Sequence, residues 1–376
     1  MFQVKEVKSN SDWKEFIQLP YSLHVRDKNW VAPLRMSVRD TLSVKKNPFW
    51  KNKKRKAWMV WNDHTPVGRI LALTDAEYDS RNNDKYGFFG YPEAINDQEV
   101  FDHLFDACMK WFAIEGAKII VGPLNPSTNY ELGILIDGFN SPPYFMMTHN
   151  PAYYDEMIRR CGFNKARDFF AYLINEQTYD QQRLERVKAK LALRKNVYVR
   201  KGNRKNFLNE LKILHQIYND AFKEHWGFFP MKWEEFQFMG KDMATILDDD
   251  LMLIAECDGE PAGFIFALPN INSLLIQSRS GKLFPKNVIN LLFKRKKISS
   301  ARILTVAVKK KFRHWGLGSY LFSEMAGNLR KNHYTDVEMS WVVEDNIQMN
   351  KAARSVGGNP YKTYRVYQKE ISAMVD

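Results

Sequence analysis

Near the C-terminal end of the chain, the spacing of apolar residues changes from that of a strand to that of a helix. The run at 303–308 is rich in aliphatic and β-branched residues, which is typical of a buried strand. The apolar residues after Gly318 follow helical spacing. We therefore expect a strand, a basic turn at 309–318 and a helix in direct succession. Their apolar residues are Ile303, Leu304, Val306 and Val308, then Tyr320, Leu321, Met325 and Leu329.

Similar patterns predict alternating strands and helices along the rest of the chain. Polar turn residues between apolar runs indicate two hairpins, around 62–66 and around 258–261. Further strands are expected at 88–91, 119–122, 169–174, 197–200, 337–343 and 361–367, with helices beginning near 97, 153, 206, 233 and 346. This mixture predicts an α/β fold of the α+β kind, with a mixed sheet. The length of 376 residues favours two domains, and we place them at 1–180 and 197–376, with a helical connector at 181–196.

The turn at 309–318 has the features of an anion-binding site. A helix that follows such a turn points unpaired backbone N–H groups and its partial positive charge toward an anion. Gly316 and Gly318 lack the Cβ atoms that would keep a phosphate away from the backbone. The turn does not match a P-loop or a Rossmann fingerprint. We interpret it as a pyrophosphate cradle, with an ordinary tight turn as the alternative.

The string Val306-x-Val308 followed by Arg313-x-x-Gly316-x-Gly318 resembles the acetyl-CoA-binding segment of the GNAT acyltransferase superfamily. The resemblance implies that the backbone of the turn holds the CoA pyrophosphate and that the strand residues Val306 and Val308 pair with pantetheine. It also implies that Asn346 lies near the CoA arm, although an asparagine there is equally suited to capping a helix. The turn residues implied in pyrophosphate binding are Arg313, His314, Trp315, Gly316, Leu317, Gly318 and Ser319.

The order of elements resembles the GNAT fold twice, so the chain looks like a bacterial protein of two tandem GNAT-like domains. In the first half, a late helix ends in Gly162-Phe163, as in the family, but the strand at 88–91 leads into the acidic segment 93–97. Acidic residues there would repel a pyrophosphate, so we expect this half to have lost its CoA site. The loops at 125–130 and 138–146 either contribute to an acceptor pocket or simply set turns.

Direct acyl transfer needs a base that acts on the amine and an acid that protonates the leaving thiolate. The resemblance implies a tyrosine acid seven positions after Asn346, but this chain has Ala353 there. We expect Tyr364 to replace it, with Tyr367 as the alternative. Glu344 is the candidate base, with Glu338 as the alternative. A capping role for Glu344 and a packing role for Tyr364 remain open.

Composition bears on the partners of the protein. The chain has 56 Lys and Arg against 43 Asp and Glu, a net charge of +13, which favours anionic partners. Basic runs at 51–56, 200–205 and 294–297 are either solvated turns or contacts for tRNA or other nucleic acid. Neither a membrane-spanning run nor a secretory signal is indicated. The three cysteines lack disulfide or zinc spacing, so we expect a cytoplasmic protein without a metal.

Taken together, the sequence predicts an N-acyltransferase that transfers an acyl group, with acetyl expected, directly from acyl-CoA to an amine. The acceptor is a small molecule or a peptide, and the sequence does not specify it further. One alternative is a Fem-like peptidyltransferase, which also duplicates the GNAT fold and uses aminoacyl-tRNA. Another is a non-catalytic protein that binds a nucleotide or nucleic acid on a GNAT scaffold.

Overall fold

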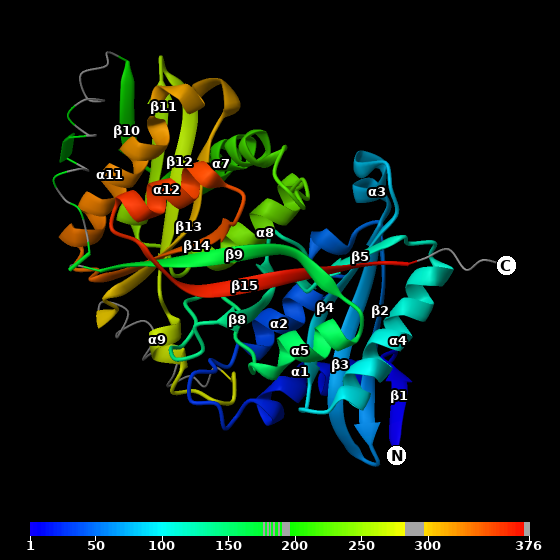
Figure 1. The fold of residues 1–376 in the computed structure, drawn as a ribbon. Helices are drawn as coiled ribbons and strands as arrows, with labels where there is room; N and C mark the ends of the chain where they lie inside the picture. Colours follow the sequence, from blue (N-terminus) through cyan, green and yellow to red (C-terminus); the bar gives the residue numbers. More distant parts are fainter. Residues whose placement is uncertain are drawn as a thin grey trace. The chain divides into compact units, whose positions relative to one another are not determined.

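The computed structural model describes residues 1–175, 177–178, 180, 182, 185–186, 189, 196–282 and 297–371 (Figure 1). Contacts divide the chain into two compact units. Unit 1 comprises Met1–Asp168, Leu274–Lys286 and Lys362–Asp376, and unit 2 comprises Phe169–Ser273 and Asn287–Tyr361. Most of the predicted connector at 181–196 and of the basic run at 294–297 lies outside the described residues. The predicted domain ranges stay a prediction, since the units are assembled from several segments of the chain.

Unit 1 is built on a mostly antiparallel sheet. Its strands follow the order β1-β2-β3-β4-β5-β15, and β8 also pairs with β15. Among the described strand pairs of this unit, β4 and β5 pair in parallel. The bounds are β1 Phe2–Glu6, β2 Lys53–Asn62, β3 Thr65–Asp75, β4 Tyr86–Ala94, β5 Ile119–Gly122, β8 Ile134–Asp137 and β15 Asn359–Glu370. A separate small sheet pairs β6 (Leu124–Asn125) with β7 (Glu131–Leu132).

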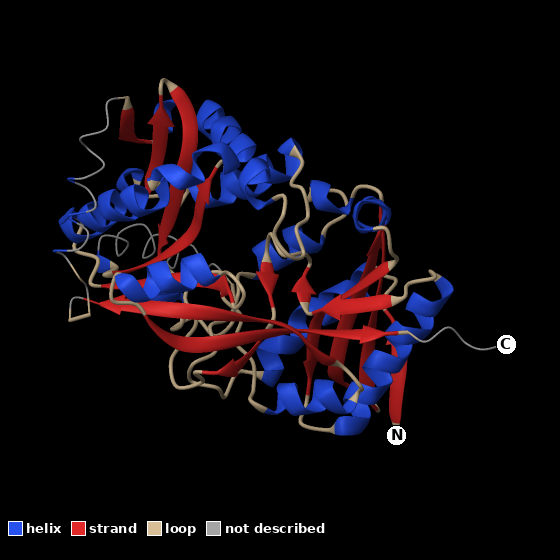
Figure 2. Cartoon of the chain, turned by 45° about the horizontal axis from the view of Figure 1, so that its top comes forward, coloured by secondary structure: helices blue, strands red, loops and turns tan. Residues whose placement is uncertain are grey.

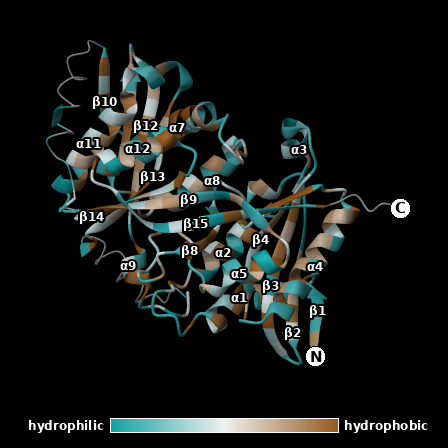
Figure 3. Cartoon of the chain, in the orientation of Figure 1, coloured by the Kyte–Doolittle hydropathy of each residue, from teal (hydrophilic) through white to brown (hydrophobic). Residues whose placement is uncertain are grey.

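Two helices of unit 1, α1 (Asn10–Leu23) and α4 (Gln98–Ile114), pack on this sheet. The other described helices of this unit are α2 Arg35–Leu42, α3 Ala76–Asn82 and α5 Tyr153–Arg160, with a short 3-10 helix, η1, at Pro48–Trp50. Hydrophobic and hydrophilic residues alternate along α4 (Figure 3). Its buried face carries Val100, Leu104 and Phe112, which join Ile70 and Ala72 of β3 in one core cluster. This amphipathic spacing explains why α4 lies on the sheet.

Unit 2 has the strand order β9-β14-β13-β12-β11-β10, and within its described residues β13 and β14 form the parallel pair. Its strands are β9 Asn164–Asn175, β10 Val197–Lys201, β11 Met252–Cys257, β12 Glu260–Pro269, β13 Ser300–Val308 and β14 Asp336–Val343. Its helices are α7 Phe207–Phe222, α8 Trp233–Ala244, α11 Leu317–Lys331 and α12 Ile347–Ser355, and the short α9 is Asn272–Leu275. Shorter 3-10 helices are η2 Arg204–Asn206, η3 Asp249–Leu251 and η5 Lys310–Trp315. Figure 2 shows these helices in blue and the strands in red.

The predicted fold class and both predicted hairpins are confirmed. Strands β2 and β3 pair on either side of Asp63-His64, and β11 and β12 pair on either side of Asp258-Gly259. The hydrophobic pattern did not predict β1, α1 and α2 in the first part of the chain. Within the described residues, no helix combines the length and the apolar character needed to cross a bilayer.

Candidate functional site

The two parallel strands of unit 2 pair along only part of their length. Their ladder runs from Ser300↔Asp336 to Ile303↔Met339. Beyond this point β13 pairs with β12, while β14 pairs with β9 as far as Val343. The facing edges of β13 and β14 therefore separate, and we call residues 304–308 and 340–343 the strand parting. Leu304, Thr305 and Val306 are half-buried there, so the parting is not filled by a packed core.

A β-bulge marks the point where the strands separate. Phe266 of β12 pairs with Thr305, and the next residue, Ala267, pairs with Ile303. Leu304 is thus the extra residue of β13. A bulge bends a strand and redirects its backbone groups, and such bulges are common beside active sites. Here the bulge lies directly after the last pair of the parallel ladder.

The basic turn begins where β13 ends. It forms the 3-10 helix η5, and Gly316 then adopts a left-handed conformation with φ 77° at the N-cap of α11. Such a conformation favours glycine. No side chain caps this helix in the part of the chain that the structure describes, so its first N–H groups are available for an anion. A Cβ added to Gly318 would meet no protein atom within 4 Å, so packing does not require glycine here and room remains for a ligand.

Cations of the turn fix it to neighbouring elements. Lys309 and Lys311 both pair with Glu260 of β12, and Lys310 pairs with Glu224 at 2.7 Å. Hydrogen bonds from Lys311 and Lys309 lower the pKa of Glu260. The Arg313 guanidinium donates to the Ala221 carbonyl of α7 at 2.6 Å. Two carboxylates therefore offset part of the positive charge of the three lysines, and the backbone N–H groups at the start of α11 add to the anion-binding capacity of the turn.

The segment that follows α7, at 225–230, is rich in aromatic residues and begins beside this turn, where the Arg313 charge acts on His225. Burial, together with the Arg313 charge, lowers the pKa of His225, which favours its neutral form. The His225 ring contacts that of Phe222 with centroids 4.9 Å apart. His314 and Ser319 of the turn are exposed, while Leu317 is buried and anchors α11.

Asn346 has the capping role that the sequence left open. Its side chain accepts a hydrogen bond of 3.0 Å from the Met349 N–H at the start of α12. Sequence reasoning missed Asn350, four residues further on. Its amide donates to the carbonyls of Val343 and Glu344 at 3.0 and 3.2 Å, and it accepts from the Tyr172 hydroxyl at 2.8 Å. Asn350 therefore holds the backbone of Glu344 in place. In the sequence, only the spacing of Asn350 from Asn346 could have indicated this role.

The two candidate bases differ in their surroundings. Glu344 is half-buried at the end of β14, next to the strand parting. Glu338 is fully buried and lies 3.6 Å from Arg302. It also accepts hydrogen bonds from the Ser340 hydroxyl, at 2.6 Å, and from the Tyr361 hydroxyl. Glu338 therefore belongs to a buried polar network, which leaves Glu344 as the more accessible base.

The candidate acids lie on the part of β15 that belongs to unit 1. Tyr364 is fully buried and pairs in register with Leu135 of β8. Tyr367 is also buried and donates its hydroxyl to Asp155, and burial raises its pKa. Ala353, at the position of the family tyrosine, is fully buried in unit 2. The acid role of Tyr364 stays a prediction.

The corresponding strands of unit 1 form no open parting. The parallel pairs of β4 and β5 end at Phe88↔Val121, and the segment Leu124–Asn125 then packs on β4. The Tyr91 N–H donates to the Asn125 side chain at 2.7 Å, and a Cβ on Gly90 would lie 2.1 Å from the Leu124 carbonyl oxygen. The chain itself occupies this position, and the loss of a CoA site in the first half stays a prediction.

The acidic residues of the segment 93–97, at the end of β4 and after it, have local partners. Glu93 pairs with Arg69 at 3.2 Å and with His24. Burial alone would raise the pKa of Glu93, but the charges of His24 and Arg69 outweigh it and lower the pKa. Asp97 caps α4 by accepting from the Glu99 N–H. Packing of the Leu124–Asn125 segment, more than charge repulsion, therefore explains why this position is closed.

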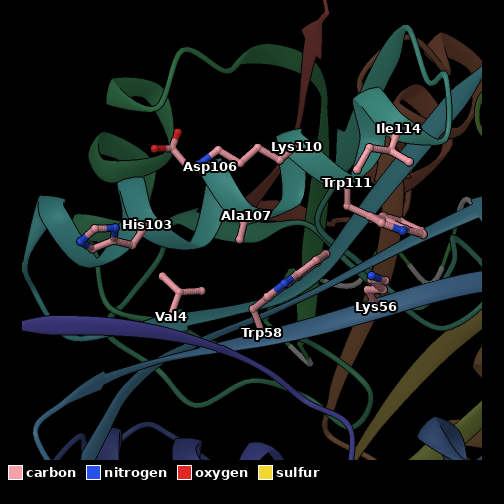
Figure 4. A pocket seen from close by; sticks show the side chains of 9 residues that line it. All are labelled: Val4, Lys56, Trp58, His103, Asp106, Ala107, Lys110, Trp111 and Ile114. Atoms are coloured by element: carbon pink, nitrogen blue, oxygen red, sulfur yellow. The ribbon is translucent and has the colours of Figure 1, made fainter.

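A surface hollow of about 360 Å³ lies beside α4 in unit 1 (Figure 4). Trp58, Trp111 and Ile114 give it an apolar wall, and its lining also includes Lys56 and Lys110. It contains none of the predicted site residues.

Comparison with solved structures identifies the fold class of this protein. The fold matches a tandem GNAT protein from the clavulanic acid biosynthesis pathway with a TM-score of 0.57 and 11% identity, covering 99% of each chain. It also matches a GCN5-related N-acetyltransferase from Sphaerobacter thermophilus, with a TM-score of 0.55, 13% identity and coverage of 100% of this chain and 97% of the other. The chain therefore has the tandem GNAT fold that the sequence predicted.

Two proteins with similar sequences show the family to which this chain belongs. The chain is 36% identical to the bacterial ceramide synthase of Caulobacter vibrioides over 375 residues, or 97% of this chain and 96% of the relative. It is 35% identical to protein YghO of Escherichia coli over 375 residues, or 98% and 95% of the two chains. No family model matches the chain. The protein belongs to the family of these two relatives.

Proposed function

We propose that this protein is an acyl-CoA-dependent N-acyltransferase whose donor site is formed by the strand parting and the basic turn of unit 2. The main support is the direct succession of an open strand edge at 304–308 and an uncapped helix start after Gly316. The first suits the amide groups of pantetheine, and the second suits a pyrophosphate. The open space beside Gly318 leaves room for a ligand next to the start of the helix.

The acceptor is proposed from the relative. A ceramide is the amide of a fatty acid and a long-chain amino alcohol, and a relative named bacterial ceramide synthase is 36% identical over nearly the whole chain. We therefore propose a fatty acyl-CoA as donor and the amine of a long-chain amino alcohol as acceptor. The sequence alone favoured acetyl, so this proposal changes the expected acyl length.

In the proposed reaction, the neutral amine attacks the thioester carbonyl carbon and forms a C–N bond. The C–S bond then breaks and CoA leaves as a thiolate. Glu344 is the proposed base, acting through water to remove the proton that the attacking nitrogen carries. The thiolate takes up a proton as it leaves, and Tyr364 stays the sequence-based prediction for the donor of that proton. Asn350 positions Glu344 through the backbone carbonyl of that residue.

The peptidyltransferase alternative receives less support from the turn. A tRNA donor would use exposed cations, but Lys309, Lys310 and Lys311 are paired with Glu260 and Glu224. The backbone site that remains is better suited to a compact pyrophosphate.

Mass spectrometry of the reaction product tests the proposed function. The purified protein is incubated with palmitoyl-CoA or acetyl-CoA and with sphinganine, and separately with aminoacyl-tRNA and the same amine. We expect the palmitoyl amide and free CoA in equal amounts. An amide formed only from aminoacyl-tRNA, or no amide from any donor, would contradict the proposal.

A further inference from the structure

Unit 1 carries a surface on which exposed aliphatic side chains alternate with cations. It is formed by α2 and the residues that follow it. We define this α2 surface by Met36, Arg39, Val44, Lys45, Lys46 and Lys51. Met36 and Val44 are 55% and 60% exposed, and each lies next to or one turn from a cation in the sequence.

The α2 surface is presented by a firmly anchored segment. Leu42, Phe49 and Trp50 are buried below it. The Trp50 indole N–H and the Asn47 amide both donate to the Thr41 carbonyl, at 2.8 and 2.9 Å. The outward positions of Met36 and Val44 are thus fixed by the packing of their neighbours.

The charge of this segment is strongly one-sided. Residues 35–56 contain nine Lys and Arg and a single acid, Asp40. Asp40 pairs with Lys46 at 2.8 Å, whereas Lys45 and Lys51 have no acidic partner among the described residues. Lysines further along the segment are paired, as Lys54 is with Glu115 at 2.6 Å. The uncompensated positive charge is therefore concentrated beside Met36 and Val44.

We propose that the α2 surface docks this protein on an anionic phospholipid bilayer. Cations beside exposed aliphatic side chains suit the interface of a bilayer, where the cations contact lipid phosphates and the aliphatic groups enter the acyl region. Nucleic acid is less suitable, because the aromatic residues of this segment, Phe49 and Trp50, are buried and cannot stack on bases. This docking proposal is argued from the residues of the α2 surface and does not depend on the proposed function. If the proposed function holds, the long-chain acceptor would reach the enzyme from the same bilayer.

Sedimentation of the full-length protein with vesicles tests this proposal. We expect binding to vesicles of phosphatidylglycerol and phosphatidylcholine in equal parts, and little binding to phosphatidylcholine alone. The double substitution Lys45→Gln/Lys51→Gln should lower the partition coefficient about fivefold for each charge removed. Met36→Asp/Val44→Asp should lower it at least as much. High salt should weaken binding of the wild-type protein.

Ile114→Asp is the matched control. Ile114 is an aliphatic residue of unit 1 that is 82% exposed, more than Met36 and Val44, and the acidic Glu115 follows it. This variant should bind vesicles like the wild type, and all variants should keep the wild-type melting temperature because each site is exposed. Absence of vesicle binding, or equal loss in the control, would overturn the proposal, as would lysine-dependent binding of tRNA in its place.

Acyl transfer to a soluble short-chain amine, measured alongside, should be unchanged in every variant. Failure of that reaction would contradict the proposed function without affecting the vesicle result.

Discussion

Ile303 of β13 and Met339 of β14 form the last pair of the parallel ladder in unit 2. Leu304, the bulged residue, follows at once, and the half-buried edge of β13 then continues to the basic turn. One continuous segment therefore supplies an open strand edge and the start of a helix. In unit 1, the Asn125 side chain and the Leu124 carbonyl occupy the corresponding position. The two units thus differ at the position where we propose the donor site.

A leucine at Gly318 should reduce acyl-CoA affinity without unfolding the protein. The added side chain meets no protein atom within 4 Å at its Cβ but would occupy the space that we assign to the donor. We expect calorimetric affinity to fall roughly tenfold or more, or about 1.4 kcal/mol. Gly327→Leu is the control, since a Cβ there also meets nothing and the residue lies in the same helix. Equal affinities of the two variants would contradict the donor site.

Substitution of the proposed base and acid should lower turnover and preserve donor binding. Because general acid–base groups contribute about 10²- to 10⁴-fold to a rate, we expect Glu344→Gln and Tyr364→Phe each to reduce kcat within that range. The affinity for acyl-CoA should stay at the wild-type value. Steady-state kinetics at saturating donor measures kcat. If both variants turned over at the wild-type rate, the two assignments would be wrong.

Loss of Glu338 should cost stability. Its removal leaves the buried Arg302 charge without its carboxylate, and breaking a buried pair typically costs about 3–5 kcal/mol. Urea unfolding of Glu338→Ala measures this loss. Asp249→Asn in the same unit is the control, because Asp249 and Arg204 form an exposed pair worth about 0–1 kcal/mol. A Glu338→Gln variant with wild-type stability and greatly reduced turnover would instead make Glu338 the base.

The ion pair of Asp168 and Arg365 should make stability depend on pH in the acid range. Burial would raise the pKa of Asp168, but hydrogen bonds from Arg365 and Lys165 outweigh burial and lower it. A carboxyl with a lowered pKa stabilises the folded state above its unfolded pKa of about 3.9, and this stabilisation disappears as the pH falls through the folded pKa.

Asp168→Asn should therefore be less stable than the wild type at neutral pH, by about 2–3 kcal/mol for charge-assisted hydrogen bonds in a largely buried pair. The difference should shrink as the pH falls below about 4. Urea unfolding of both proteins across this range measures it. A difference that is independent of pH would show that the carboxylate charge contributes little.

Local patterns in the sequence predicted much of unit 2. The β13–turn–α11 succession depends on apolar spacing and on Gly316 and Gly318, which act over a few residues. The hairpin at Asp258-Gly259 depends on equally local turn chemistry. The ladder end at Ile303↔Met339 depends on the register of two strands far apart in sequence, and no local pattern fixes such a register.

Other features depended on partners that the sequence does not reveal. The sequence offers Glu338 as an alternative base, because it does not reveal that Arg302 and Tyr361 contact this carboxylate in the folded protein. Asn350 carried no signal apart from its spacing from Asn346, because its three carbonyl acceptors are backbone groups. The closure of unit 1 by Asn125 likewise arises from tertiary packing.

Hydrogen–deuterium exchange with and without palmitoyl-CoA tests the central claim most directly. If the donor binds in unit 2, amides at 304–308 and 316–319 should exchange more slowly with the ligand, because the first segment pairs with pantetheine and the second holds the pyrophosphate. Amides at 90–97 of unit 1 should exchange at the same rate in both samples. Protection at 90–97, or unchanged exchange at 304–308 and 316–319, would contradict a donor site in the strand parting of unit 2.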